Sequence, residues 1–131
     1  MSKTRILVVD DEVDVSFMLK LTLEQSGEFE VREENDSTRA VASVREFLPL
    51  LILMDVLMPE LDGGDVAALL DADPELSGIP ILFLTAAVLK EEVNSSHGML
   101  GGRRFLAKPV EPLELIRAIH EAMANGAGES T

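Results

Sequence analysis

Short runs of branched, apolar residues recur along this chain and are separated by stretches with helical periodicity. Four of these runs are nearly continuous in apolar character and lie at residues 6–9, 50–54, 79–84 and 105–107. Each is too short for a buried helix and has the pattern of a strand that is covered on both faces of a parallel sheet. A weaker run at residues 29–32 alternates apolar and charged residues, which is typical of a half-exposed strand at a sheet edge.

Helical periodicity connects these runs. Apolar residues repeat at helical spacing in four stretches, at Val15, Met18, Leu19 and Leu23, at Ala40, Val41, Val44, Phe47 and Leu48, at Val66, Leu69 and Leu70, and at Leu115, Ile116, Ile119, Ala122 and Met123. Gly27 and Gly126 are the expected ends of the first and last helices. Residues 88–102 are rich in Gly, Ser and Asn and favour at most a short helix. The alternation predicts five β/α units that form a parallel sheet with helices on both faces.

Composition narrows the class of protein. A length of 131 residues suits one domain, which we expect to span residues 1–125, followed by a flexible tail of residues 126–131. With 24 acidic against 11 basic residues the net charge is −13, which argues against direct binding of nucleic acid or of an anionic membrane. No apolar stretch is long enough to act as a secretory signal or to span a bilayer, so we expect a cytoplasmic location.

Chemically active residues stand where four of the five expected strands end. Asp10 and Asp11 follow the first strand, Asp55 the third, Thr85 the fourth and Lys108 the fifth. The carboxyl ends of parallel strands meet at one edge of the sheet, where open α/β folds bind their ligands. Three carboxylates at that edge repel one another unless a cation neutralises them, and Mg2+ prefers such oxygens. The chain has no cysteine, and no histidine near these positions, which argues against zinc.

The same edge carries groups that suit a phosphoryl group. Thr85 can hydrogen-bond an anionic oxygen, and Lys108 supplies positive charge. Asp55 stands alone at its strand end and is the candidate nucleophile, since aspartate forms acyl phosphates, whereas the paired Asp10 and Asp11 are better suited to a metal. Taken singly, each has an ordinary alternative: a helix cap for the aspartates, a buried hydroxyl for the threonine and a solvated charge for the lysine.

Four motifs in this order resemble those of the receiver domains of two-component response regulators, the family of the bacterial chemotaxis regulator. They are ILVVDDE at residues 6–12, LILMDVLMPELDG at 51–63, ILFLTA at 81–86 and FLAKP at 105–109. The resemblance covers about residues 4–124. It implies a flavodoxin-like, doubly wound α/β fold of five β/α units with the strand order 2-1-3-4-5.

The resemblance implies a signalling role for these residues. Asp55 would accept a phosphoryl group from a phosphohistidine of a sensor histidine kinase or a phosphotransfer domain. The implied ligands of Mg2+ are Asp11 and Asp55 directly, the backbone carbonyl of Leu57, and Asp10 through water. The implied phosphoryl-binding groups are the Thr85 hydroxyl, the Lys108 ammonium and the Ala86 amide. Such a protein catalyses its own phosphotransfer and a slow self-dephosphorylation, and it is not a turnover enzyme.

The resemblance also implies how the signal leaves the site. Phosphorylation would draw Thr85 inward and let Phe105, at the family's aromatic switch position, turn into the vacated space. That movement would change the surface formed by the fourth helix, the fifth strand and the fifth helix, where a downstream protein or a second copy of the chain would dock. Phosphorylation shifts two pre-existing states only by its different interaction with each.

Three features depart from the family's usual pattern. Phe105 replaces tyrosine, so burial of the ring must favour its inward position in place of a hydroxyl hydrogen bond. Leu57 and Ala87 are apolar where the family often has polar residues beside the phosphoryl group, which predicts modest self-dephosphorylation. Residues 101–104 are two glycines and two arginines in place of more usual acidic residues, which puts positive charge near the output surface.

Two other functions stay open on the sequence alone. A receiver-like interaction module that is never phosphorylated would be expected to lack the acids, the threonine or the lysine, and all are present. An acid-cluster phosphatase generally needs a second carboxylate two residues after the nucleophile, where this chain has Leu57.

Overall fold

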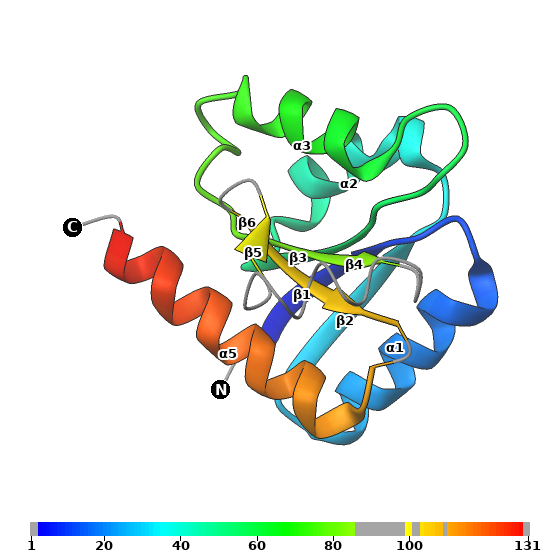
Figure 1. Ribbon diagram of the computed structural model, residues 1–131, viewed down its shortest axis with the longest axis vertical. Helices are drawn as coiled ribbons and strands as arrows, with labels where there is room; N and C mark the ends of the chain where they lie inside the picture. The colour runs from blue at the N-terminus through cyan, green and yellow to red at the C-terminus, as the bar shows by residue number, and fades with distance from the viewer. Residues whose placement is uncertain (1–2, 86–98, 101–102, 109, 130–131) are drawn as a thin grey trace.

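The computed structural model describes residues 3–85, 99–100, 103–108 and 110–129, and one sheet forms its centre (Figure 1). The strands are β1 Thr4–Val9, β2 Phe29–Glu34, β3 Leu51–Asp55, β4 Ile81–Thr85, β5 Met99–Leu100 and β6 Arg103–Ala107. Their order across the sheet is β2-β1-β3-β4-β6-β5. Five strands pair in parallel, and β5 pairs antiparallel to β6. The predicted parallel order 2-1-3-4-5 is confirmed, with β6 as the fifth parallel strand, and the two-residue β5 is an addition that was not predicted.

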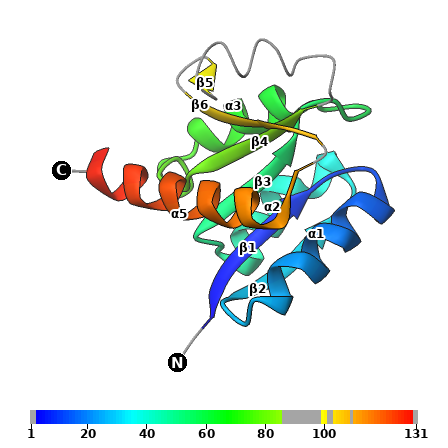
Figure 2. The ribbon, with the colours of Figure 1, turned by 60° about the horizontal axis from the view of Figure 1, so that its bottom comes forward.

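Helices cover both faces of this sheet, as predicted. Those in the described residues are α1 Val13–Gln25, the 3-10 helix η1 Ser37–Arg39, α2 Ala40–Phe47, α3 Gly63–Asp71 and α5 Pro112–Glu129. α1 and α5 lie on one face, and α2 and α3 lie on the other (Figure 1, Figure 2). The short helix expected within residues 88–102 falls mainly on residues 86–98, which lie outside the described residues.

The central strands are buried on both faces because alternate residues point to opposite helix layers. In β1, Ile6 and Val8 belong to the apolar cluster beneath α1 and α5. Leu7 and Val9 belong to the cluster beneath α2 and α3. All five residues of β3 are buried as well. This two-sided burial is the physical reason why the strands appear in the sequence as continuous apolar runs.

Local signals set several of the helix ends. α1 stops at Gln25, and Gly27 just beyond it has a φ of 79°, so the predicted stop is confirmed. The side chain of Asp36 accepts a hydrogen bond at the start of η1. Asp62 begins α3 with a capping box, in which its side chain and that of the third helical residue bond each other's backbone N–H groups.

α5 is longer than predicted. It continues through Gly126 to Glu129, so the predicted end at Gly126 is wrong. A glycine costs a helix only about 1 kcal/mol, and no proline follows it to stop the helix. The division into a domain of residues 1–125 and a tail of residues 126–131 stays a prediction. In the described part of the chain no helix, α5 included, has the length and apolar character that crossing a membrane requires.

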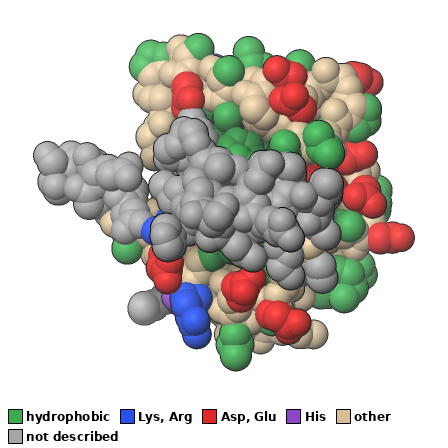
Figure 3. All heavy atoms as spheres, in the orientation of Figure 1, with side chains coloured by type: hydrophobic (Ala, Val, Ile, Leu, Met, Phe, Trp, Pro, Cys, Tyr) green, Lys and Arg blue, Asp and Glu red, His purple; other side chains and the backbone are tan. Residues whose placement is uncertain are grey.

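The two edges of the sheet differ in character. β5 lies at one edge, and β2 forms the other. In β2, Phe29 and Val31 are buried while Glu30 is exposed and Arg32 is half-buried, which confirms the predicted half-exposed edge strand. The backbone N–H of Val31 donates to Oε2 of Glu24 in α1 at 3.1 Å. Acidic side chains are spread over the face shown in Figure 3, in keeping with the net charge of −13.

Candidate functional site

Three acidic side chains meet where β1 and β3 end at the carboxyl edge of the sheet. Asp10 and Asp11 follow β1, and Asp55 is the last residue of β3. Each offers one carboxylate oxygen, and these three oxygens lie within 4.8 Å of one another. Asp10 and Asp55 are only 1% and 6% exposed, and Asp11 is half-buried. The structure therefore brings together the three acids that the sequence singles out.

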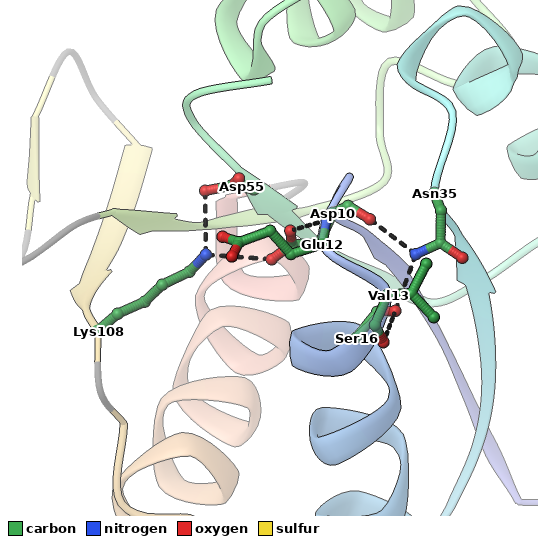
Figure 4. A network of polar contacts seen from close by, with 7 residues as sticks. All are labelled: Asp10, Glu12, Val13, Ser16, Asn35, Asp55 and Lys108. Atoms are coloured by element: carbon green, nitrogen blue, oxygen red, sulfur yellow. Dashed lines mark hydrogen bonds and ion pairs between the residues drawn. The ribbon is translucent and has the colours of Figure 1, made fainter. Parts of the chain in front are cut away.

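Lys108 joins the acids from the end of β6. Its Nζ donates to Oδ2 of Asp10 at 3.1 Å and to Oδ1 of Asp55 at 3.2 Å (Figure 4). Its backbone N–H donates to the carbonyl oxygen of Thr85 at 2.8 Å, which fixes the base of the side chain against the end of β4. One ammonium group thus faces two nearly buried carboxylates directly.

The protonation equilibria of the site reflect this crowding. Burial and then the negative charge of Asp10 raise the pKa of Asp55 above its ordinary value, and Lys108 only partly opposes them. Burial alone would lower the pKa of Lys108, but its hydrogen bonds to Asp10 and Asp55 and their charges raise it. Three carboxylates face a single ammonium group here, so negative charge is in excess and a further cation would relieve it.

The acids fit a hard divalent cation. The group consists of aspartates alone, without the sulfur or imidazole ligands that zinc favours. Mg2+ is usually bound through one or two carboxylates and keeps several waters, which leaves positions for phosphoryl oxygens. The donor set of Asp10, Asp11 and Asp55 therefore fits Mg2+.

Thr85 ends β4, and its side chain is fully buried. Its hydroxyl oxygen has no hydrogen-bond partner among the residues that the structure describes. A buried polar group without a partner is costly, and an anionic oxygen brought to the site would satisfy it. The two residues after Thr85 are Ala86, predicted to donate its amide, and Ala87, and both lie outside the described residues.

The connection from β3 to α3 passes very close to Asp55. The backbone N–H of Gly63 donates to the carbonyl oxygen of Val56 at 2.8 Å. A Cβ atom on Gly63 would lie 2.5 Å from the backbone oxygen of Asp55, so only glycine permits this approach. Leu57, in the same connection, is 62% exposed. The predicted role of its carbonyl as a metal ligand stays a prediction.

Phe105 of β6 packs on Phe83 of β4. The ring centroids are 4.9 Å apart, and the ring planes are inclined by 20°. Phe105 is half-buried against the cluster beneath α2 and α3. Next to it in sequence, Arg104 forms an ion pair of 3.2 Å with Glu121 of α5. The switch role of Phe105 stays a prediction.

Polar residues on the far side of Asp10 were not predicted. Asn35 follows β2, and its Nδ2 donates to the backbone carbonyl of Asp10 at 2.8 Å and to Oγ of Ser16 at 2.9 Å (Figure 4). The sequence feature that could have revealed Asn35 is its place as a polar residue directly after the carboxyl end of a strand. The predicted strand stops at residue 32, whereas β2 continues to Glu34, and this error hid the position of Asn35 at the site edge.

The chain is similar to known proteins over most of its length. The family model of the response regulator receiver domain matches residues 6–120. The DNA-binding response regulator MtrA of Mycobacterium tuberculosis is 37% identical over 118 residues, which cover 89% of this chain and 49% of that protein. The chain thus spans about half the length of this relative.

Solved structures share the fold. The signal receiver domain of a signal transduction histidine kinase from Syntrophus aciditrophicus is 30% identical, with a TM-score of 0.77 over 93% of this chain and 91% of that one. A sensor protein from a Polaromonas species is 25% identical, with a TM-score of 0.81 over 95% of this chain and 99% of that one. By the match of the family model over residues 6–120 and the fold shared with these structures, the chain belongs to the family of response regulator receiver domains.

Proposed function

We propose that this chain is a phosphorylation-dependent switch of a two-component system, which accepts a phosphoryl group on Asp55 from a sensor histidine kinase or a phosphotransfer domain. The observation that carries the proposal is the position of the Asp55 carboxylate, next to two other acids and bonded to the ammonium of Lys108. A carboxylate in such surroundings, at the carboxyl edge of a parallel sheet, is well placed to act as a nucleophile toward phosphorus.

The transfer forms one bond and breaks another. A carboxylate oxygen of Asp55 attacks the phosphorus of a phosphohistidine while the P–N bond breaks, and the imidazole nitrogen keeps the electron pair and takes up a proton. Lys108 Nζ, already bonded to Asp55, can shift to a phosphoryl oxygen, and the unpartnered Thr85 hydroxyl can donate to another. Asp11, Asp55 and the Leu57 carbonyl, with Asp10 acting through water, are the residues that would hold Mg2+, which when bound would supply positive charge to the phosphoryl oxygens.

The same proposal includes an output. A phosphoryl group adds about −1.5 to −2 charges beside Thr85, and movement of Thr85 would make room for the Phe105 ring to turn. The changed surface, which includes β6 and α5, would then bind a downstream protein or a second copy of the chain. Because the net charge is −13, we do not expect this domain itself to contact nucleic acid. We expect it to act in the cytoplasm.

Phosphorylation can be tested with a small donor. Incubation with acetyl phosphate and Mg2+ is expected to add the mass of one phosphoryl group to the intact protein. Asp55→Asn should show no adduct, because an amide oxygen is a far weaker nucleophile than a carboxylate. Asp62→Asn is the matched control: Asp62 lies on the same connection, and asparagine also caps helices well, so this variant should be labelled like the wild type.

Other results would favour the alternatives. Continuous release of phosphate from phosphate esters would support an acid-cluster phosphatase. Absence of any adduct on the wild type, with acetyl phosphate and with a phosphoramidate donor, would support an interaction module that is never phosphorylated. An adduct that persists in Asp55→Asn would place the phosphoryl group on another residue.

Leu57 provides a second prediction, on the lifetime of the phosphoryl group. Leu57→Asn is expected to speed the decay of phosphorylated Asp55 about tenfold, because an amide can orient a water molecule that a leucine cannot. Decay is followed by intact mass after removal of the donor. Leu57→Ala is the control, since it opens access to water without supplying a polar group and should change the rate little. Equal decay in Leu57→Asn and the wild type would contradict the prediction.

A further inference from the structure

The backbone carbonyl of Asp10 is held by a side chain at the point where β1 leaves the sheet. The N–H of Asp10 donates to the carbonyl oxygen of Glu34 at 3.1 Å, so the ladder with β2 reaches this residue. In a parallel ladder the carbonyl of Asp10 would next accept the N–H of Asp36. That N–H instead donates to Oε2 of Glu34 at 3.1 Å. Nδ2 of Asn35 takes its place, at 2.8 Å from the Asp10 carbonyl oxygen.

The amide of Asn35 is itself anchored from a second element. Its Nδ2 also donates to Oγ of Ser16 at 2.9 Å. Ser16 is fully buried in the first turns of α1, and its hydroxyl has two acceptors within reach, Oε1 of Glu33 at 2.9 Å and the carbonyl of Val13 at 3.1 Å. Figure 4 shows Asn35 reaching from the end of β2 to both β1 and α1. Two acceptors on two elements fix the orientation of the amide.

We infer that Asn35 is a positioning residue for the metal-binding acids, an inference that rests on the proposed function. The carbonyl of Asp10 and the N–H of Asp11 belong to one planar peptide unit. A hydrogen bond that holds the carbonyl therefore fixes that plane, and with it the directions in which both aspartate side chains leave the backbone. Asn35 touches neither carboxylate and acts only through this peptide.

This restraint matters because the acids repel one another. The carboxylate of Asp10 is held by the N–H of Glu12 at 2.9 Å and by Lys108, whereas no hydrogen bond to the Asp11 carboxylate is found in the described residues. If the Asp10–Asp11 peptide could rotate, the two carboxylates would move apart, and a bound cation would have to draw them together again. Loss of the Asn35 amide should therefore weaken Mg2+ binding while leaving the phosphoacceptor chemistry intact.

The experiment compares three variants of the full chain. Asn35→Ala removes the whole restraint and is expected to raise the Mg2+ dissociation constant about tenfold, as loss of an orienting group around a metal site commonly does. Ser16→Ala removes the anchor of the amide, together with the bonds of the hydroxyl to Glu33 and Val13, but leaves the bond from Asn35 to Asp10, so it should raise the constant less. Ser43→Ala is the matched control: Ser43 is a fully buried serine that bonds Glu34 at the same end of β2, without a contact to Asp10 among the described residues.

Two measurements separate positioning from a general structural role. The first is the Mg2+ dissociation constant by calorimetry, beside unfolding in urea for every variant. The second is the rate of labelling by acetyl phosphate as a function of Mg2+. Asn35→Ala should need about tenfold more Mg2+ for half-maximal labelling and reach the wild-type rate at saturation. Ser43→Ala should lose stability and keep the wild-type Mg2+ dependence.

The outcomes are distinguishable. Wild-type Mg2+ affinity in folded Asn35→Ala, or an equal loss of affinity in Ser43→Ala, would overturn the inference and leave the proposed function standing. If Asn35→Ala does not fold, an unchanged affinity in Ser16→Ala would overturn it. Failure of the wild type itself to bind Mg2+ and to be labelled would remove the proposed function as well.

Discussion

Replacement of Gly63 by alanine is expected to destabilise the protein by about 3 kcal/mol, the upper range for forcing an extra atom into a packed interior. The new Cβ would lie 2.5 Å from the backbone oxygen of Asp55, 3.0 Å from Cε1 of Phe83 and 3.1 Å from the Cα of Val56. Two of these atoms belong to the backbone and cannot move away by a side-chain rotation. The end of β3 must shift, and the Asp55 carboxylate shifts with it.

The neighbouring glycine provides the control for this prediction. A Cβ on Gly64 would meet only Oδ1 of Asp62, at 3.3 Å, and alanine is a better helix former than glycine by about 1 kcal/mol. Gly64→Ala should therefore be neutral or mildly stabilising in urea unfolding, and it should be labelled by acetyl phosphate like the wild type. Equal stability of the two alanine variants would show that the backbone approach at Gly63 is not restrictive.

Loss of the Lys108 ammonium is the second large effect that we expect. Lys108→Met leaves the carboxylates of Asp10 and Asp55, 1% and 6% exposed, without their cation. Removal of one partner from a buried ion pair costs about 3–5 kcal/mol, and partial exposure of Lys108 reduces this to about 2 kcal/mol in the metal-free protein. Urea unfolding with a chelator measures the loss, and saturating Mg2+ should restore part of it.

A surface lysine separates this effect from a simple change of net charge. Lys3 is exposed, and Lys3→Met should change the free energy of unfolding by less than about 0.5 kcal/mol. If Lys108→Met proved as stable as Lys3→Met in the absence of metal, the ammonium would not be the compensating charge of the site.

The effect of Lys108→Met should also depend on pH. The pKa of Asp55 is raised in the folded protein, mainly by burial, and removal of the ammonium raises it further. A carboxyl group whose pKa is higher in the folded than in the unfolded protein contributes most to stability below its pKa in the unfolded chain. That contribution is lost as the pH rises through its pKa in the folded protein. The variant should therefore recover stability relative to the wild type as pH falls from 7 toward the pKa of Asp55.

At high pH the group that titrates is Lys108. The pKa of Lys108 is raised above its ordinary value of 10.5. Its contribution is complete below that value and is lost as pH rises through the folded pKa. The free energies of unfolding of the wild type and of Lys108→Met should therefore approach each other at both ends of the pH range and differ most in between.

Much of the fold could be predicted because burial leaves a simple mark on residue order. In β1, Leu7 and Val8 face opposite helix layers and both must be apolar, so the strand appears as an unbroken apolar run. The site followed from topology: parallel strands end at one edge, and Asp10, Asp55 and Lys108 meet there although 98 residues separate the first from the last.

Features that depend on small energy differences were harder to predict. Glycine at 126 lowers the stability of a helix without ending it, so the length of α5 depends on the residues after that glycine. β5 consists only of Met99 and Leu100, and two apolar residues between glycines are too short a run to show the pattern of a strand. Asn35 acts through a carbonyl of another strand, and no local pattern shows which distant backbone group an amide will meet.

The edge formed by β2 has a consequence for behaviour at high concentration. An uncovered strand edge is a template on which further chains can assemble into fibrils, and proteins resist this with charge and with blocked backbone groups. Here the carboxylate of Glu24 accepts the backbone N–H of Val31. The charged residues Glu30 and Arg32 alternate with the apolar residues Phe29 and Val31 along the strand. An incoming strand would have to displace that carboxylate and meet a strongly acidic molecule, so the folded protein should stay monodisperse where a neutral sheet edge would aggregate.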